Sequence, residues 1–166
     1  MKTKTIVLTL ALCFSGGVVC FAQDPNLGTW KLNEAKSRLS PRAPQNTIVV
    51  YEAVGEKLKV TIDGIGSDGK PIHTEWTGRY DGKDYPVIGD PNSDARSVTK
   101  IDEHTLGFNI TRSGRITVSG RIVVSADGKS RTVTSSGVDL TGKKVSSVLV
   151  YDKQQSEVSA LPVHPK

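Results

Sequence analysis

Cysteine is nearly absent from the sequence, and its two copies, Cys13 and Cys20, both lie near the amino terminus. If the first 22 residues are removed as a leader, the remaining 144 residues contain no cysteine. This excludes disulfides and cysteine metal sites from the rest of the chain. Its stability must come from packing and backbone hydrogen bonds, and its length is sufficient for one hydrophobic core.

Long hydrophobic runs are also lacking, because Ser15, Gly16 and Gly17 interrupt the single apolar stretch at residues 6–14. That stretch is shorter than the roughly 20 residues needed to span a bilayer. We therefore predict no membrane span.

Residues 1–22 instead have the pattern of a secretory signal peptide. Lys2 and Lys4 supply its positive start, and Cys20-Phe21-Ala22 is a small-x-small cleavage site. Val19 before Cys20 argues against lipid attachment. We predict cleavage after Ala22 and a secreted or periplasmic location, with one domain at residues 23–153 and a disordered tail at 154–166.

No concentration of charge marks a nucleic-acid-binding surface. Without Lys2 and Lys4 the chain has 20 basic and 17 acidic side chains, a net charge of +3. The basic residues occur singly, without the clusters and interleaved aromatic residues of a nucleic-acid interface. We predict no nucleic-acid partner.

Catalytic and metal-binding motifs are missing as well. The sequence has no Gly-x-Ser-x-Gly elbow, phosphate-binding loop or His-Glu-x-x-His. The histidines, His73, His104 and His164, have no partner at metal-ligand spacing. We predict no cofactor, no metal and no catalytic residue, although a site formed by residues distant in sequence stays open.

One segment has part of a calcium-loop pattern, Asp90-x-Asn92-x-Asp94. Ala95 occupies the position that requires glycine, and Ile101 occupies the position of the bidentate glutamate. The segment therefore predicts a polar turn.

What the sequence does contain is a series of short alternating segments, typical of antiparallel strands. The residues predicted to face inward are Leu58, Val60, Ile62, Ile72, Thr74, Trp76, Leu106, Phe108, Ile110, Ile116, Val118, Ile122 and Val124. Asp68-Gly69, Asp81-Gly82 and Asp127-Gly128 are predicted corners. The fold class predicted is an all-β, up-and-down antiparallel barrel of about eight to ten strands.

Three regions are less regular. Asn33 is predicted to cap a short helix at residues 34–39, and residues 84–94 are predicted to form a long loop. In the penultimate strand, either the face of Arg131 or the face of Thr132 can point inward, because both faces are partly polar.

The residues Gly28-x-Trp30 open the first strand. The phrase Gly-Thr-Trp-Lys-Leu-Asn-Glu-Ala-Lys-Ser (28–37), with Asp-Gly-Lys-Asp-Tyr-Pro (81–86), resembles small exported bacterial lipocalin-like (calycin-type) proteins of unassigned function. In lipocalins a basic residue of the last strand packs over the first-strand Trp. Here the last strand offers Lys143 and Lys144, and Arg131 lies one strand earlier. The resemblance implies a barrel in which Gly28, Trp30 and Arg131 are structural.

These observations favour non-enzymatic binding of a small hydrophobic or amphipathic ligand inside the barrel. The residues predicted to contact it are Trp76, Phe108, Leu58, Val60 and Ile72 on the inner wall, with Tyr80 and Tyr85 at the mouth. The alternative is a filled barrel that binds another protein of the cell envelope, and enzymatic activity ranks third. An apolar cavity opening beside residues 84–94 would distinguish the first two.

Cleavage of the predicted signal peptide after Ala22 would determine the mass of the protein recovered from the cell envelope or medium. Intact-mass spectrometry should find a chain that begins at Gln23. A species that retains residues 1–22, or carries lipid on Cys20, would contradict the signal-peptide interpretation.

Overall fold

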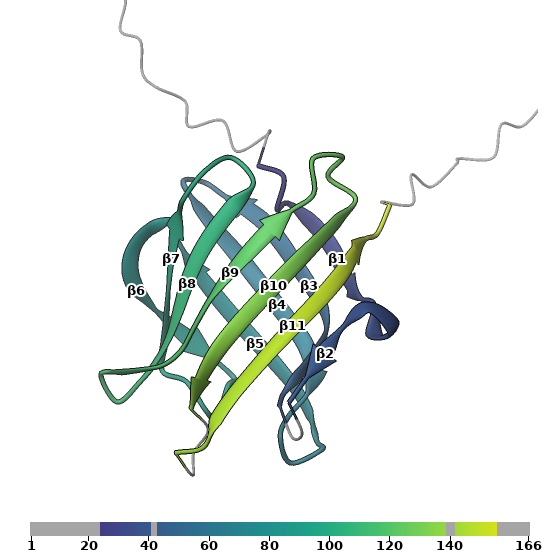
Figure 1. Ribbon diagram of the computed structural model, residues 1–166. Helices are drawn as coiled ribbons and strands as arrows, with labels where there is room; N and C mark the ends of the chain where they lie inside the picture. The colour runs from purple at the N-terminus through teal and green to yellow at the C-terminus, as the bar shows by residue number, and fades with distance from the viewer. Residues whose placement is uncertain (1–23, 41–42, 139–141, 156–166) are drawn as a thin grey trace, which may run out of the picture.

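The computed structural model describes residues 24–40, 43–138 and 142–155, and these form an all-β barrel (Figure 1). A single 3-10 turn, η2 (Glu34–Lys36), follows the first strand. The described strands are β1 (Gly28–Leu32), β2 (Arg38–Leu39), β3 (Gln45–Val54), β4 (Lys57–Ile65), β5 (Pro71–Gly78), β6 (Asp81–Ile88), β7 (Ala95–Lys100), β8 (Thr105–Arg112), β9 (Arg115–Val124), β10 (Ser130–Val138) and β11 (Lys144–Lys153).

The strands pair antiparallel in chain order from β3 to β11, and β1 closes the ring by pairing with both β3 and β11. The closed barrel therefore has ten strands, while β2 pairs with β11 beyond the end of β1. Closure leaves no exposed sheet edge in the ring. The predicted fold class, a lipocalin-like antiparallel barrel, is confirmed. No helix among the described residues is long and apolar enough to cross a bilayer.

Alternation along the strands places the apolar residues in the interior, as predicted for β4, β5 and β8. In β10 it is the face of Arg131 that points inward, because Arg131 is opposite the buried residues Val124 and Tyr151. The buried hydrophobic core comprises Trp30, Leu32, Val49, Tyr51, Leu58, Val60, Trp76, Val98, Leu106, Phe108, Ile122, Val124, Leu149 and Tyr151.

The predicted helix at residues 34–39 is wrong in extent. Asn33 does cap a helical turn, and its side chain accepts a hydrogen bond from the Lys36 backbone N–H at 3.2 Å. The turn ends at Lys36 because Arg38 and Leu39 pair with β11 as β2. Strand pairing to an existing sheet therefore replaces the weak local helical preference.

The predicted long loop at residues 84–94 is also wrong, because β6 continues to Ile88. Pro86 is tolerated in this strand. The Val87 N–H donates to the Asp94 carbonyl on the β7 side at 3.0 Å, so the missing N–H of Pro86 would point toward β5. There β5 pairs with β6 only at Glu75–Ile88 and Trp76–Val87.

Asp81-Gly82 is a bulge and not the predicted corner. The register with β7 shifts between Asp81 and Asp84, and Gly82 has a φ of 75°. Asp68-Gly69 and Asp127-Gly128 do form corners, with φ of 80° at Gly69 and 67° at Gly128.

The prediction that Ile116 faces inward is wrong. A register shift between Ile110 and Thr111 places Ile116 opposite Thr111, so the alternation of β9 changes there. Ile116 is consequently 60% exposed.

Two strand glycines allow neighbouring backbones to approach closely. A Cβ at Gly137 would collide with the Thr117 carbonyl oxygen, and a Cβ at Gly120 would meet the Thr134 carbonyl oxygen and the Phe108 ring. Gly120 lies opposite Phe108, whose ring covers it. These glycines permit the coiling that closes the barrel.

The two ends of the barrel are packed differently. The end that carries Trp30 holds the largest enclosed side chains, including Trp30 and Tyr151 at 0% and 1% exposure. The inner wall toward the opposite end carries smaller, partly exposed residues, among them Ile62, Ile110 and Val118. The connections at that opposite end are residues 66–70, 89–94 and 113–114.

Substitution of Gly137 tests the close approach of β9 and β10. Gly137→Ala should lower the free energy of unfolding by about 1–3 kcal/mol, because the added methyl must displace a neighbouring backbone. Gly107→Ala is the control, since its Cβ would meet only the Ile101 side chain, at 3.3 Å. Urea unfolding measures both variants, and equal stabilities would contradict the proposed strain.

Candidate functional site: the barrel interior

Trp30 is the anchor of one end of the interior. Its indole Nε1 donates a hydrogen bond to the Asn26 carbonyl at 2.7 Å, so the segment before β1 covers it. The Arg131 guanidinium lies 4.9 Å from the ring centroid, and the Lys153 Nζ lies 5.0 Å from it. The basic contact over the first-strand Trp thus comes from β10 and from the end of β11, and not from Lys143 or Lys144.

Arg131 is buried at 2% exposure among aromatic rings. Its guanidinium carbon is also 4.9 Å from the centroid of Tyr51 and 4.8 Å from that of Tyr151. Burial lowers the pKa of Arg131, while the nearby tyrosines oppose this shift. Its Nε and Nη1 have no hydrogen-bond partner, so the rings provide much of its stabilisation.

Tyrosine hydroxyls form the polar part of this enclosed region. The Tyr151 hydroxyl donates to the Asn46 carbonyl at 3.0 Å, and burial raises the pKa of Tyr151 to about 12. Burial also raises the pKa of Tyr80, with further contributions from Tyr51 and Asp24. Both hydroxyls consequently remain protonated near neutral pH, and the Tyr151 hydroxyl acts as a donor. The Tyr80 hydroxyl has no hydrogen-bond partner.

Arg96 is a second interior guanidinium, which the sequence analysis missed. It projects inward from β7 with its guanidinium carbon 5.7 Å from the Trp76 ring centroid and 5.1 Å from that of Phe108. Its Nε is buried and has no partner. The signal was present in the sequence, because Arg96 is two positions from Val98, which is buried in the core.

Trp76 of β5 makes a direct contact with β7, although β6 lies between these two strands and pairs with β5 at only two positions. Its Nε1 donates to the Arg96 carbonyl at 2.9 Å. The Tyr85 ring meets the Trp76 ring edge-on, with centroids 6.1 Å apart. The Tyr85 hydroxyl donates to Asp81 at 3.0 Å.

The residues predicted to bind a ligand are therefore distributed over two environments. Leu58, Val60, Trp76 and Phe108 lie in the packed core with exposures of 0–8%. The partly buried members are Ile72, Tyr80 and Tyr85.

Toward the opposite end the inner wall combines apolar residues with hydroxyls. The partly buried apolar residues that pack against the core there include Ile62, Val87, Ile110, Val118 and Val133. The Ser135 and Ser147 hydroxyls are 2.8 Å apart on the same inner wall. This half of the interior has the composition of a small-molecule site, apolar with a few polar groups.

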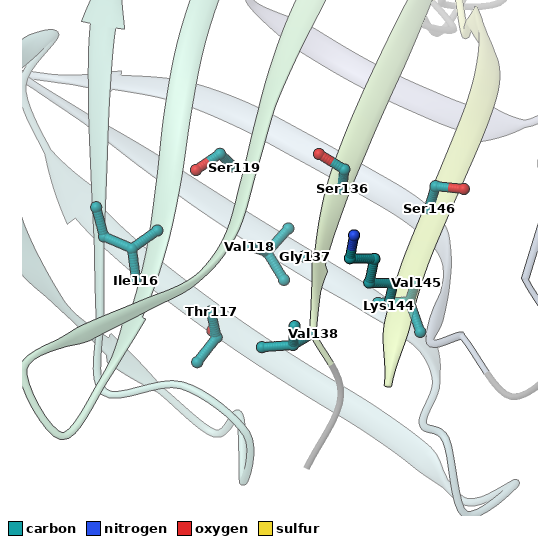
Figure 2. A pocket seen from close by; sticks show the side chains of 10 residues that line it. All are labelled: Ile116, Thr117, Val118, Ser119, Ser136, Gly137, Val138, Lys144, Val145 and Ser146. Carbon is teal, nitrogen blue, oxygen red and sulfur yellow. The ribbon is translucent and has the colours of Figure 1, made fainter. Parts of the chain in front are cut away.

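A separate hollow of about 620 Å³ lies against β9, β10 and β11 (Figure 2). Its lining residues all come from these three adjacent strands, and none from the opposite wall, so it is a one-sided groove. Ser119, Ser136 and Ser146 form a row across it on the outward side of the sheet. It contains none of the residues predicted to contact a ligand.

The metal-like motif folds as a polar turn. Asp90 accepts from the Asn92 N–H at 2.8 Å and from the Ser93 hydroxyl at 2.7 Å, and Asp94 accepts from the Ser113 N–H. Within residues 24–40, 43–138 and 142–155, no group of three or more histidine or acidic side chains is placed to hold a metal ion.

His73 lies on the exposed outer face of β5. Its Nδ1 is 2.6 Å from the Asp63 carboxylate, whose hydrogen bond raises the pKa of His73. The groups around it are solvated, which is typical of a surface ion pair.

Comparisons with known proteins do not identify a family. No family model matches the chain, and no curated protein matches it. The structure of EF1p2_mFAP2b bound to DFHBI is 14% identical with a TM-score of 0.44, covering 78% of this chain and 94% of that chain. A redesigned β-barrel, mFAP1, bound to DFHBI, is 20% identical with a TM-score of 0.38, covering 77% and 96%. At these scores the ligand of those proteins is uninformative about this chain.

The raised pKa of Tyr151 predicts a loss of stability at alkaline pH. The folded-state pKa is about 12 and the ordinary value is 10.0, so the contribution is present below pH 10 and is lost as the pH rises toward 12. A shift of this size corresponds to at most about 2.7 kcal/mol. Urea unfolding at pH 8 and pH 11.5 measures the loss.

Tyr151→Phe should reduce this alkaline loss, and should cost about 1 kcal/mol at pH 8 because the Asn46 carbonyl loses its donor. Ser135→Ala, which removes a hydrogen-bonded hydroxyl that does not titrate in this pH range, serves as the control and should retain the alkaline loss. An unchanged pH dependence in Tyr151→Phe would show that other groups cause it.

Proposed function

We propose that this chain is an exported barrel that binds a small amphipathic molecule, without catalysis, in the half of its interior remote from Trp30. The supporting observation is the uneven packing of the interior. Trp30, Tyr51 and Tyr151 fill one end. The inner wall at the other end consists of smaller, partly exposed aliphatic residues.

The chemistry of this wall suits an amphipathic guest. Val118 and Val133 offer apolar contact, and the paired hydroxyls of Ser135 and Ser147 offer hydrogen bonds. Transfer of an alkyl chain from water to such a surface contributes about 0.8 kcal/mol per buried methylene group. Export is supported by the signal-peptide pattern of residues 1–22.

A second candidate is an interaction module that binds another envelope protein. It is favoured by exposed apolar side chains near the strand ends at the end of the barrel remote from Trp30: Ile65 at 39%, Ile88 at 66%, Ile116 at 60% and Val138 at 43%. The groove on β9, β10 and β11 adjoins two of them, Ile116 and Val138.

Titration with the neutral dye Nile red, displaced by 1-dodecanol, tests the first proposal. Binding should saturate at one equivalent. Ile110→Trp, which fills the interior at a position that does not line the groove, should weaken it at least about tenfold by steric exclusion. Val123→Trp lies on the outward face of the neighbouring strand β9, where Val123 is 43% exposed, and should leave affinity unchanged.

Ser136→Trp distinguishes the external groove from the interior. Loss of dye binding in this variant, with binding intact in Ile110→Trp, would place the ligand in the groove. Absence of any saturable binding would overturn the ligand-binding proposal and favour the interaction module.

A further inference from the structure

Two guanidinium groups inside the barrel have no carboxylate partner. Among the described residues, the ion pairs join Lys59 to Glu75, Lys70 to Asp68, His73 to Asp63 and Glu75, and Arg79 to Glu56. None involves Arg96 or Arg131. The buried guanidinium nitrogens without a hydrogen-bond partner are Nε of Arg96, both Nε and Nη1 of Arg131, and Nη1 of Arg112 at the end of β8. An unpaired buried charge is unfavourable unless other groups compensate for its lost hydration.

Aromatic rings compensate the lost hydration of the two guanidinium groups to different degrees. Arg131 lies within 5 Å of three aromatic centroids and is fully enclosed near Trp30, so it has a structural role. Arg96 is only partly buried and contacts two rings at longer distances, 5.7 and 5.1 Å. A guest that enters the remote half of the interior can therefore reach Arg96 more readily than Arg131.

Asp24 is the carboxylate that reaches this region from the segment before β1. Its Oδ1 accepts from the backbone and side chain of Asn26 at 2.9 and 3.0 Å, while its Oδ2 is buried without a partner. It faces Tyr80, and it lies beyond 4 Å from both guanidinium groups. Two guanidinium groups against one carboxylate leave the interior with an excess of positive charge.

Arg96 also has an apolar path beside it. Its register partner on β8 is Ile110, which is opposite Val118 on β9. Both aliphatic side chains are partly buried and point inward. A cation next to an apolar wall matches a molecule with an anionic head and a hydrocarbon chain.

We propose that the ligand is a monocarboxylate with an alkyl chain, whose carboxylate binds the Arg96 guanidinium while its chain lies along Ile110 and Val118. This assignment rests on the proposed function and specifies the ligand class. The guanidinium offers two parallel N–H donors to a carboxylate, a charge-assisted arrangement stronger than neutral hydrogen bonds.

The test compares dodecanoate with 1-dodecanol at pH 8 by calorimetric titration, since the two share a chain length and differ in charge. Wild-type protein should bind dodecanoate at least tenfold more tightly than dodecanol. Arg96→Met, which keeps the apolar stem, should bring the ratio of the two affinities near one while dodecanol still binds. Arg121→Met removes an exposed arginine on the outward face of β9 and should preserve the preference.

Asp24→Asn provides a second test that leaves Arg96 in place. Loss of the competing negative charge should tighten dodecanoate binding and leave dodecanol binding unchanged. An affinity ratio near one in wild type, or a preference that persists in Arg96→Met, would overturn the carboxylate assignment alone. Failure of wild type to bind either compound would overturn the proposed function itself.

Discussion

The stacking of the Arg131 guanidinium over the Trp30 indole is the contact on which the rest of the barrel depends. Trp30 belongs to β1, which closes the ring between β3 and β11, and Arg131 reaches it from β10. The contact therefore joins strands from opposite ends of the chain. Because no cysteine follows residue 22, packing of this kind holds the closure in place of a disulfide.

This anchor also explains the uneven interior. Filling one end with Trp30, Tyr51 and Tyr151 concentrates aromatic volume around Arg131. The inner wall of the other half carries valine, isoleucine and serine, together with glycines where strands approach closely. Arg96 lies between the two regions, with Trp76 and Phe108 against its guanidinium. A closed end packed with aromatic rings, a partly exposed opposite half and Arg96 between them form the structural basis of the proposed ligand site.

Sequence patterns were reliable where alternation was uninterrupted. In β4 the positions of Leu58 and Val60 followed directly from a period of two, and both are buried. The predictions failed where a single residue changed the register, as at the bulge that exposes Ile116 and the one that contains Gly82. Bulges depend on the partner strand, which local sequence does not specify. Pro86 led to the wrong prediction of a loop for a similar reason. A proline fits within a strand only where its missing N–H faces a side that has no pairing partner, and the tertiary structure decides which side of β6 that is.

By itself the sequence determined the all-β barrel class, because repeated alternation and Asp-Gly corners favour hairpins regardless of their neighbours. It also located Gly28-x-Trp30 at the start of the first strand. Only the tertiary structure decided that Arg131 faces inward, since both faces of its strand are partly polar. It likewise brought Arg96 into the interior beside Trp76, twenty residues away in sequence. Such a charge can be judged unpaired only when the residues surrounding it are known, and those come from strands distant along the chain.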